Sequence, residues 1–269
     1  MPELPEVETV LRTLEGQIRD AVIRDIDIYL LKMLDRDPDS FRSRLIGQGF
    51  RDFRRRGKYL LFVMDDCILV SHLRMEGKYF LYPDGQPPAK HTHVVFHLED
   101  GRALHYNDTR KFGTMEIIEK DTDLAHFHDL GPEPLTDEYT GAYVYAYMHS
   151  HERPVKSILL DQNFAAGIGN IYADEILSAS RIRPGSSSKR LTHKDCNEIA
   201  DNTKVILSEA IRAGGTTIRS YTSSLGVTGR FQLSCCVHGM DTCRRCGSRV
   251  KIKKIGGRSS YYCPFCSKR

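Results

Sequence analysis

The feature that most constrains this chain is a set of four cysteines close to its C-terminus. Cys243 and Cys246 form one Cys-x2-Cys pair, sixteen residues intervene, and Cys263 and Cys266 form a second pair. Each pair lets one tight turn present two thiolates, and two such turns complete a tetrahedral sulfur shell around one ion. The spacing therefore predicts one structural Zn2+ with no open coordination position. Rubredoxin-like iron and a metal-free motif are the alternatives.

The segment between the two cysteine pairs is expected to form a β-hairpin. Residues 250–255 and 260–262 flank Gly256-Gly257, a dipeptide that suits a two-residue hairpin turn. Arg258 follows this turn directly. A metal-clamped hairpin would hold that arginine rigidly enough to meet a phosphate or a sugar.

The other cysteines and the absence of targeting signals indicate a reducing compartment. Cys67 and Cys196 lie in segments that resemble a buried strand and a helix, and Cys235 and Cys236 are adjacent, which disfavours a disulfide between them. No apolar run is long enough to span a membrane, and no secretory signal is visible. We therefore expect a soluble, cytoplasmic protein.

Basic residues are concentrated in two stretches of the chain. Residues 42–58 carry seven basic side chains against one acid, and residues 241–269 carry nine against one, although the net charge of the whole chain is only +4. Such local excess predicts a polyanionic partner. A solvated charged face is the alternative for either stretch taken alone.

The hydrophobic pattern predicts an α+β protein of more than one domain. Residues 7–18 place Val7, Val10, Leu11, Leu14 and Ile18 at helical spacing, and residues 21–120 form short strand-like runs broken by turns such as Glu99-Asp100-Gly101. Helical patterns follow at about 136–148, 154–160, 170–180 and 192–213. We expect an N-terminal helix with a β-sandwich or barrel at 1–130, a helical domain at 131–230, and the cysteine hairpin at 231–269. Residues 216–230, which are rich in Ser, Thr and Gly, are expected to form a flexible loop at the end of the helical domain.

The first residues suggest covalent chemistry. A small second residue usually permits removal of Met1, which would leave Pro2 as a secondary amine whose pKa is two to three units below that of lysine, near 7.7–8.0 for an ordinary α-amino group. Such an amine condenses with an aldehyde to give a cationic iminium, and Glu3 is a neighbouring general acid. Because Pro and Glu are also common in the first turn of a helix, a purely structural role is the alternative.

Two further segments suit an anion. A glycine-bearing turn at 163–170 ends at Asn170, which we expect to cap the next helix and to leave main-chain N–H groups for a DNA phosphate. Arg153 and Lys156, just upstream, strengthen that interpretation, whereas a plain interhelical turn is the alternative. Lys58, which ends the run Arg54-Arg55-Arg56-Gly57-Lys58, is either a proton-transfer group or a phosphate contact.

Taken together, these segments resemble the formamidopyrimidine-DNA glycosylases of the Fpg/MutM type, over essentially the whole chain. The resemblance is carried by MPELPEVETV at the start, RRRGKYL (54–60), SHLRMEGKY (71–79), KHTHVVF (90–96), DTRKFGT (108–114), LGPEPL (130–135), LLDQNFAAGIGNIYADEIL (159–177) and GGRSSYYCPFC (256–266). It implies the fold that the family shares: a helix and β-sandwich, a helix-two-turn-helix domain and a C-terminal zinc ribbon.

The resemblance also implies catalytic roles. Pro2 aligns with the nucleophile that attacks C1′ of the damaged nucleotide, and Glu3 with the general acid that helps to open the sugar. Lys58 aligns with the lysine of proton transfer, and Arg258 with the finger arginine of the second elimination.

Other positions align with residues that contact DNA. Met75, Arg110 and Phe112 match the side chains that fill the gap left by an extruded nucleotide, although core packing is the alternative for Met75 and Phe112. The remaining implied DNA contacts are His91, Arg153, Lys156 and Asn170, together with Arg110.

The implied function is that of a bifunctional DNA glycosylase and AP lyase, a monomer that excises 8-oxoguanine and formamidopyrimidines from damaged double-stranded DNA by β,δ-elimination, without a nucleotide cofactor. An endonuclease VIII-like enzyme for oxidised pyrimidines is one alternative, against which Leu4, Met75 and Phe112 argue. A non-catalytic zinc-ribbon DNA-binding protein is another, against which the presence of Pro2 and Glu3 argues.

One stretch departs from the family pattern. Family members usually continue from Phe-Gln to Leu-x-Val-Tyr-Gly, whereas this chain has Cys235 at the Leu position and His238 at the Tyr position. Because the stretch precedes the hairpin, we expect any consequence to concern how the hairpin docks and which lesion is preferred.

Overall fold

The computed structural model describes residues 1–216 and 230–267, which divide into two compact units. The first unit holds residues 1–2, 6–124 and Thr216, and the second holds residues 3–5, 125–215 and 230–267. The predicted loop at 216–230 falls almost wholly outside the described residues. Within the described part of the chain, no helix has the length and apolar character that crossing a bilayer requires.

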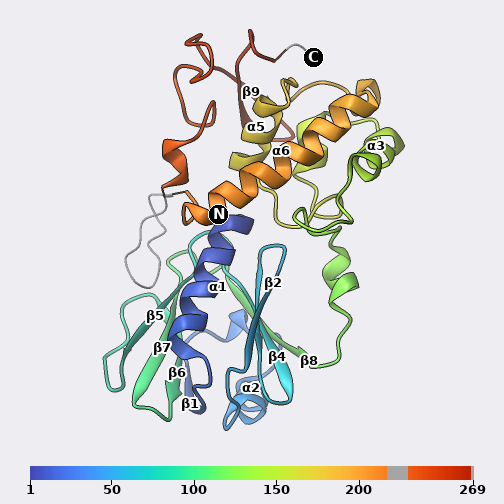
Figure 1. Ribbon diagram of the computed structural model, residues 1–269. Coiled ribbons are helices and arrows are strands. Elements are labelled where there is room, and N and C mark those ends of the chain that lie inside the picture. The colour runs from blue at the N-terminus through green and yellow to red at the C-terminus, as the bar shows by residue number, and fades with distance from the viewer. Residues whose placement is uncertain (217–229, 268–269) are drawn as a thin grey trace. The chain divides into compact units, whose positions relative to one another are not determined.

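The first unit consists of two four-stranded antiparallel sheets and the helix α1, Leu4–Ile18, from Glu6 onward (Figure 1). One sheet has the order β1-β6-β7-β5, and the other has the order β2-β3-β4-β8. Their strands are β1 (Ile23–Ile28), β2 (Asp52–Arg56), β3 (Tyr59–Val63), β4 (Cys67–His72), β5 (Lys78–Pro83), β6 (Thr92–Leu98), β7 (Arg102–Asn107) and β8 (Thr114–Glu119). Two short helices, η1 (Leu31–Met33) and α2 (Pro38–Leu45), connect β1 to β2.

One hydrophobic core joins these layers. The apolar stripe predicted for α1 is buried in it, together with the inward side chains of both sheets. The turn predicted at 99–101 joins β6 to β7, and Gly101 takes a positive φ of 80° there, a conformation that glycine adopts without steric cost. The predicted helix and β-sandwich are therefore confirmed.

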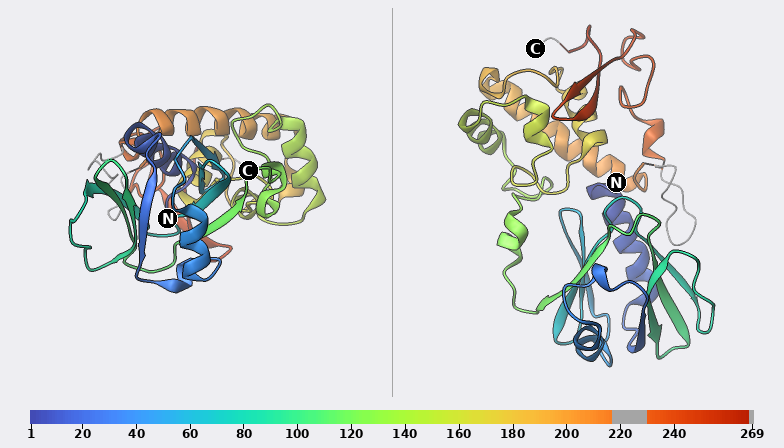
Figure 2. Two further views of the ribbon diagram at one scale, coloured as in Figure 1. Left: turned by 90° about the horizontal axis from the view of Figure 1, so that it is seen from below. Right: turned by 180° about the vertical axis from the view of Figure 1, so that it is seen from behind.

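The second unit is helical and ends in the cysteine hairpin. Its elements are η2 (Leu124–Asp129), α3 (Gly141–Ser150), α4 (Val155–Leu159), α5 (Asn170–Ala179), η3 (Ser188–Arg190), α6 (His193–Arg212), η4 (Phe231–Leu233), β9 (Lys251–Ile255) and β10 (Arg258–Tyr262). The β9–β10 hairpin, coloured red, lies against α5 (Figures 1 and 2), where the Tyr261 N–H donates to Asp174 Oδ2.

Local caps decide where the helices begin. A capping box begins α6: the Thr192 side chain accepts from the Asp195 N–H, and the Asp195 side chain accepts from the Thr192 N–H. Helix α3 begins at Gly141, later than the 136 expected, because Thr140 caps it and accepts from the Tyr143 N–H.

Candidate functional site

The side chain of Glu3, a residue far away in the sequence, binds the N-terminal end of helix α5 in the second unit. Its carboxylate accepts hydrogen bonds from the Ile171 N–H at 3.0 Å and the Tyr172 N–H at 3.3 Å, and its side chain is only 3% exposed. These are two of the main-chain donors that a helix leaves unpaired at its start, where the helix dipole favours a negative charge. The covalently preceding residue is Pro2, which is buried.

This arrangement corrects the expected role of Asn170. Gly169 occupies the N-cap position and Asn170 is the first helical residue, so its side chain does not cap α5. The Asn170 amide instead donates to the Ser259 carbonyl at 3.1 Å. The anion that binds the start of α5 in this structure is therefore the carboxylate of Glu3, which sequence spacing did not indicate.

The two glycines of the turn before α5 make room for the N-terminus. A Cβ on Gly169 would lie 2.6 Å from both Cγ and Oε1 of Glu3, and a Cβ on Gly167 would lie 2.7 Å from Cβ of Leu4. The Leu4 N–H also donates to the Gly167 carbonyl at 3.0 Å. The turn is thus a cradle for residues 3–4, formed by residues 167–172, and only glycine fits where the two backbones approach.

Lys156 lies at the centre of a buried polar network. Its side chain is fully buried, and its ammonium donates to the Ser259 carbonyl at 3.0 Å and pairs with Asp174 Oδ1 at 2.7 Å. The other Asp174 oxygen contacts His238 Nδ1 at 2.7 Å. Lys156 therefore joins α4 to the hairpin, and its predicted contact with DNA stays a prediction.

The charges around Lys156 include two of the predicted catalytic residues. Burial lowers the pKa of Lys156 from its ordinary value, and the negative charge of Asp174 opposes that shift. Glu3 raises and Arg258 lowers the same pKa, so both lie within electrostatic reach of the Lys156 ammonium. The second unit thus gathers Glu3, Lys156, Asn170 and Arg258.

Arg258 lies where the hairpin was expected to place it. It opens β10 opposite Ile255, directly after Gly256 and Gly257, whose φ values are 55° and 77°. The Arg258 side chain is exposed, whereas a Cβ on Gly256 would lie 3.1 Å from Ser157 Oγ. The turn therefore packs on α4 while the arginine is left open to a ligand.

Lys58 occupies the tight turn between β2 and β3 in the first unit. It is 6% exposed and follows Gly57, whose φ is positive. The neighbouring Arg55 forms an ion pair with Glu8 of α1 at 2.9 Å and donates to the Gly57 carbonyl at 3.0 Å. This ion pair fixes the turn that carries Lys58 to the first turns of α1, the helix that follows Pro2.

Glu6 provides a second anchor that the sequence did not suggest. Its buried carboxylate accepts from the Thr216 N–H at 2.8 Å and the Thr216 hydroxyl at 3.0 Å. Thr216 is the last described residue before the predicted loop. The start of that loop is therefore held on the first turn of α1.

Asp108 shapes the loop that carries Arg110 and Phe112. Its fully buried carboxylate accepts from the N–H groups of Arg110, Phe112 and Gly113 at 2.8–2.9 Å. Phe112 is 50% exposed, with the Arg110 guanidinium 4.9 Å from its ring centroid. Core packing is therefore excluded for Phe112, and the loop presents an apolar and a cationic side chain together.

Met75 lies in a neighbouring loop of the same unit. Added Cβ atoms at Gly77 and at Gly113 would both overlap the Tyr106 hydroxyl, so both loops close on one buried tyrosine. Met75 itself is half-buried and is absent from the core cluster. The β4–β5 loop, which carries Met75, and the β7–β8 loop, which carries Phe112, thus both pack against Tyr106.

The remaining predicted DNA contacts lie on the surface. His91 is half-buried, and its carbonyl accepts from the Asp108 N–H at 2.9 Å. Arg153 has a side chain that is 40% exposed and forms an ion pair with Asp161 at 2.8 Å. Both side chains are accessible to a ligand in their own units.

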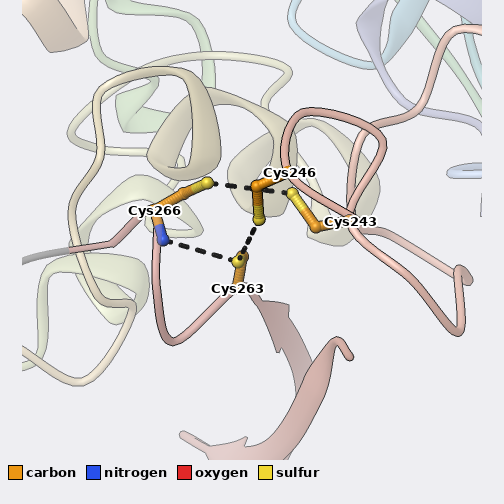
Figure 3. Close-up of side chains that lie close together, drawn as sticks. All are labelled: Cys243, Cys246, Cys263 and Cys266. Atoms are coloured by element: carbon orange, nitrogen blue, oxygen red, sulfur yellow. Dashed lines mark hydrogen bonds between the residues drawn. The ribbon is translucent and has the colours of Figure 1, made fainter. Parts of the chain in front are cut away.

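The four cysteine thiols converge as their spacing predicted (Figure 3). All four sulfur atoms lie within 4.8 Å of one another, with Cys246–Cys263 at 3.5 Å and Cys243–Cys266 at 4.0 Å. A tetrahedral zinc with Zn–S bonds of about 2.3 Å requires S–S separations of about 3.8 Å. Hydrogen bonds from Ser248 lower the pKa of Cys246 to about 6, which favours the thiolate. The cluster can therefore hold one metal ion, and its donor set fits zinc.

The stretch that departs from the family pattern is fixed to α5. Glu175 accepts from the N–H groups of Cys236, Val237 and His238 at 2.6–3.0 Å. His238 reaches Asp174, so this segment and the hairpin contact the same turn of helix. Asp174 and Glu175 were missed as functional candidates because nothing local marks a carboxylate whose partners are distant main-chain donors.

Two family models together cover most of the chain. The formamidopyrimidine-DNA glycosylase N-terminal domain matches residues 1–115, and the formamidopyrimidine-DNA glycosylase H2TH domain matches residues 130–222. Formamidopyrimidine-DNA glycosylases of Streptococcus pneumoniae and Bacillus licheniformis are 45% and 43% identical to this chain, with all of both chains covered in each comparison.

Solved structures agree with these relatives. Lactococcus lactis Fpg in complex with DNA containing an abasic site has a TM-score of 0.93 and 38% identity, over 99% of this chain and 100% of that one. A variant of the same enzyme with DNA containing Fapy-dG has the same score and identity over the full length of both chains. With its helix and two sheets, its helical unit and its cysteine hairpin, this chain belongs to the formamidopyrimidine-DNA glycosylase family.

Proposed function

We propose that this protein is a bifunctional DNA glycosylase and AP lyase that removes formamidopyrimidines and 8-oxoguanine from damaged duplex DNA. Membership of the family supports the reaction class, and the DNA complexes of the Lactococcus lactis relative support the substrate class. The observation that carries the proposal in this chain is the cradle that holds Glu3, because it fixes the residue directly after Pro2.

In the proposed reaction, loss of Met1 frees the nitrogen of Pro2, which attacks C1′ of the flipped nucleotide. The C1′–N bond to the base breaks, the sugar ring opens, and an iminium links Pro2 to C1′. Glu3 is proposed to donate the proton that opens the ring. The iminium acidifies the C2′ proton, so its removal expels the 3′ phosphate, and a second elimination releases the 5′ phosphate.

The remaining assignments follow the loops that carry each residue. Phe112, Met75 and Arg110 are proposed to fill the gap in the stack, which the 50% exposure of Phe112 favours. Lys58 is proposed to assist proton transfer, and Arg258 to contact the sugar or phosphate during the second elimination. The other proposed DNA contacts are His91, Arg153, Lys156 and Asn170.

The metal is proposed to be a single structural Zn2+. Bound by Cys243, Cys246, Cys263 and Cys266, it would supply folding energy to the hairpin and would have no open position for a substrate. The bound zinc is thereby proposed to hold the hairpin in the conformation that positions Arg258.

Borohydride trapping on a duplex with a single 8-oxoguanine tests the proposal. Reduction of the iminium should join the protein covalently to DNA, and mass spectrometry should locate the link at Pro2. The matched control is the same protein with Met1 retained, whose Pro2 nitrogen is acylated and should give no adduct. A link at a lysine, or an adduct of equal yield with Met1 retained, contradicts the proposal.

A comparison of substrates separates the related alternatives. Cleavage of formamidopyrimidine and 8-oxoguanine duplexes should be faster than cleavage of a thymine glycol duplex. The reverse order would indicate an endonuclease VIII-like enzyme, and DNA binding without any adduct would indicate a non-catalytic binder.

A further inference from the structure

A fifth cysteine, Cys236, lies beside the four-cysteine cluster. Its sulfur is 3.9 Å from the sulfur of Cys243, a separation that falls between those of Cys246–Cys263 and Cys243–Cys266 inside the cluster. Cys236 also packs in the small hydrophobic core that contains Cys243 and Cys263. The proposed metal uses four of these five thiols, and the fifth has no role in the proposed reaction.

The backbones of the two cysteines are held together. The Arg244 N–H, directly after Cys243, donates to the Cys236 carbonyl at 3.2 Å. The Cys236 N–H is in turn fixed by Glu175 at 2.6 Å. A disulfide bond needs an S–S distance of about 2.05 Å, so the two sulfur atoms must approach by roughly 1.9 Å, which side-chain rotation can supply between backbones already joined.

Accessibility differs between the two thiols. Cys236 is half-buried, whereas Cys243 is 1% exposed. Cys235, adjacent in the chain, is buried and directs its thiol to the Phe231 carbonyl at 3.8 Å. Cys236 is therefore the thiol outside the cluster that is placed to pair with one of its members.

We propose that Cys236 and Cys243 form a disulfide when the protein meets a peroxide, and that this bond removes Cys243 from the metal shell. The thiol of Cys236, the more exposed of the two, attacks one peroxide oxygen, the O–O bond breaks, water leaves with the thiol proton and a sulfenic acid forms. The sulfur of Cys243 then attacks the sulfenic sulfur of Cys236, so that an S–S bond forms, the S–O bond breaks and the departing hydroxide takes up a proton to become the second water. In total, two thiols lose two electrons and one hydrogen peroxide becomes two waters.

The consequence concerns the hairpin. With three thiolates left, the cluster no longer closes a tetrahedral shell, and the metal should be released. A reductant and added Zn2+ should restore the original state because the disulfide is reversible. Cys236 thus makes the hairpin sensitive to oxidation at a defined pair of sulfur atoms.

Peptide mapping identifies the bond directly. Trypsin alone leaves all three candidate thiols in one peptide, residues 231–244, whereas adding a protease that cleaves before Asp241 separates residues 231–240 from residues 241–244. After treatment of the full-length, metal-loaded protein with about one equivalent of hydrogen peroxide, these two peptides should be linked without reductant and separate with it. Metal release, followed with a chromogenic chelator, should occur in step with the link.

Two variants complete the experiment. The Cys236→Ser variant should hold its metal before oxidation and should give no linked peptides after peroxide treatment. It should release its metal under peroxide at least about fivefold more slowly than the natural protein. Cys235→Ala should behave like the natural protein. Metal content and thermal unfolding before oxidation show that each variant is folded. The proposal is overturned if Cys236→Ser releases metal as fast as the natural protein, or if the first disulfide joins Cys246 to Cys263 or Cys243 to Cys266.

Discussion

Replacing Gly169 with alanine should disturb Glu3 and little else. The backbone of Gly169 has φ −131° and ψ −163°, which alanine adopts without strain. The added Cβ would lie 2.6 Å from Cγ and Oε1 of Glu3, which is too close for any real contact. The Glu3 carboxylate must therefore leave the N–H groups of Ile171 and Tyr172, or the turn must move away from it.

The size of the effect follows from the bonds at risk. A hydrogen bond to a charged group contributes about 1.5–3 kcal/mol, so losing both sets an upper bound of about 3–6 kcal/mol. Partial relaxation of the turn should reduce the loss in the free energy of unfolding to about 2–4 kcal/mol. A displacement of about 1 Å at a reacting group can slow catalysis roughly 100-fold, so cleavage should fall by about that factor.

Urea unfolding and single-turnover cleavage of an abasic-site duplex measure the two effects. Gly16→Ala is the matched control because Gly16 lies within α1 with no atom within 4 Å of an added Cβ, so it should be neutral or slightly stabilising. Adding Glu3→Ala to Gly169→Ala removes the clashing atoms, and the double variant should be more stable than Gly169→Ala alone. If Gly169→Ala unfolds and cleaves like Gly16→Ala, the cradle does not position Glu3.

Three further substitutions test other parts of the site. Phe112→Ala should lower the free energy of unfolding, measured in urea, by less than about 1 kcal/mol because Phe112 is 50% exposed. It should nevertheless reduce the fluorescence change of a 2-aminopurine placed opposite or beside the lesion. A decrease of several kcal/mol in the free energy of unfolding would mean that the ring is part of the core. Lys156→Met should destabilise the protein by about 3–5 kcal/mol because it leaves the buried Asp174 charge without its ammonium partner, and a change below about 1 kcal/mol would show that the pair is dispensable. His97 lies between Asp84 and Asp27, and although burial lowers its pKa, these hydrogen bonds raise it overall. The protonated ring therefore stabilises the fold fully below about pH 6.5 and progressively less as the pH rises through its raised pKa. His97→Gln should accordingly shift the urea midpoint more at pH 5.5 than at pH 8.5. An equal shift at both pH values would contradict the stabilising role of the protonated ring.

The parts of the fold that the sequence predicts are those decided by neighbours in the chain. Short strand-like runs broken by turn residues indicated a β-rich region at 21–120, which holds the strands β1 to β8, and the turn expected at 99–101 joins β6 to β7. The capping box of α6 and the cysteine spacing are likewise local, since the first involves only residues 192–195 and the second only residues 243–266. Such features can be predicted from the sequence because the residues that form them are close together along the chain.

The parts that escaped prediction are contacts between distant segments. Asn170 is a good capping residue by type, but Glu3 takes the main-chain donors of α5 from 168 positions away and leaves Asn170 for the hairpin. Glu6 and Thr216 are 210 positions apart, and no local pattern announces their bonds. The catalytic assignments for Lys58 and Arg258 came from the family resemblance, because a basic run and a turn arginine alone do not define a role.

A protein that binds a polyanion benefits when its own carboxylates do not repel that partner, and this chain buries several of them against main-chain donors. In the first unit, Glu6 accepts from Thr216 and Asp108 accepts from the loop of Phe112. In the second unit, Glu3 accepts at the start of α5, and Glu175 accepts from the segment that holds Cys236. Each accepted bond also fixes a segment that carries a proposed contact, so one interaction both hides a negative charge and positions a residue. The basic side chains of the same loops, Arg110 and Arg258 among them, remain exposed. The net charge of +4 therefore understates the positive charge that these loops present, because the acids closest to them in the fold are buried.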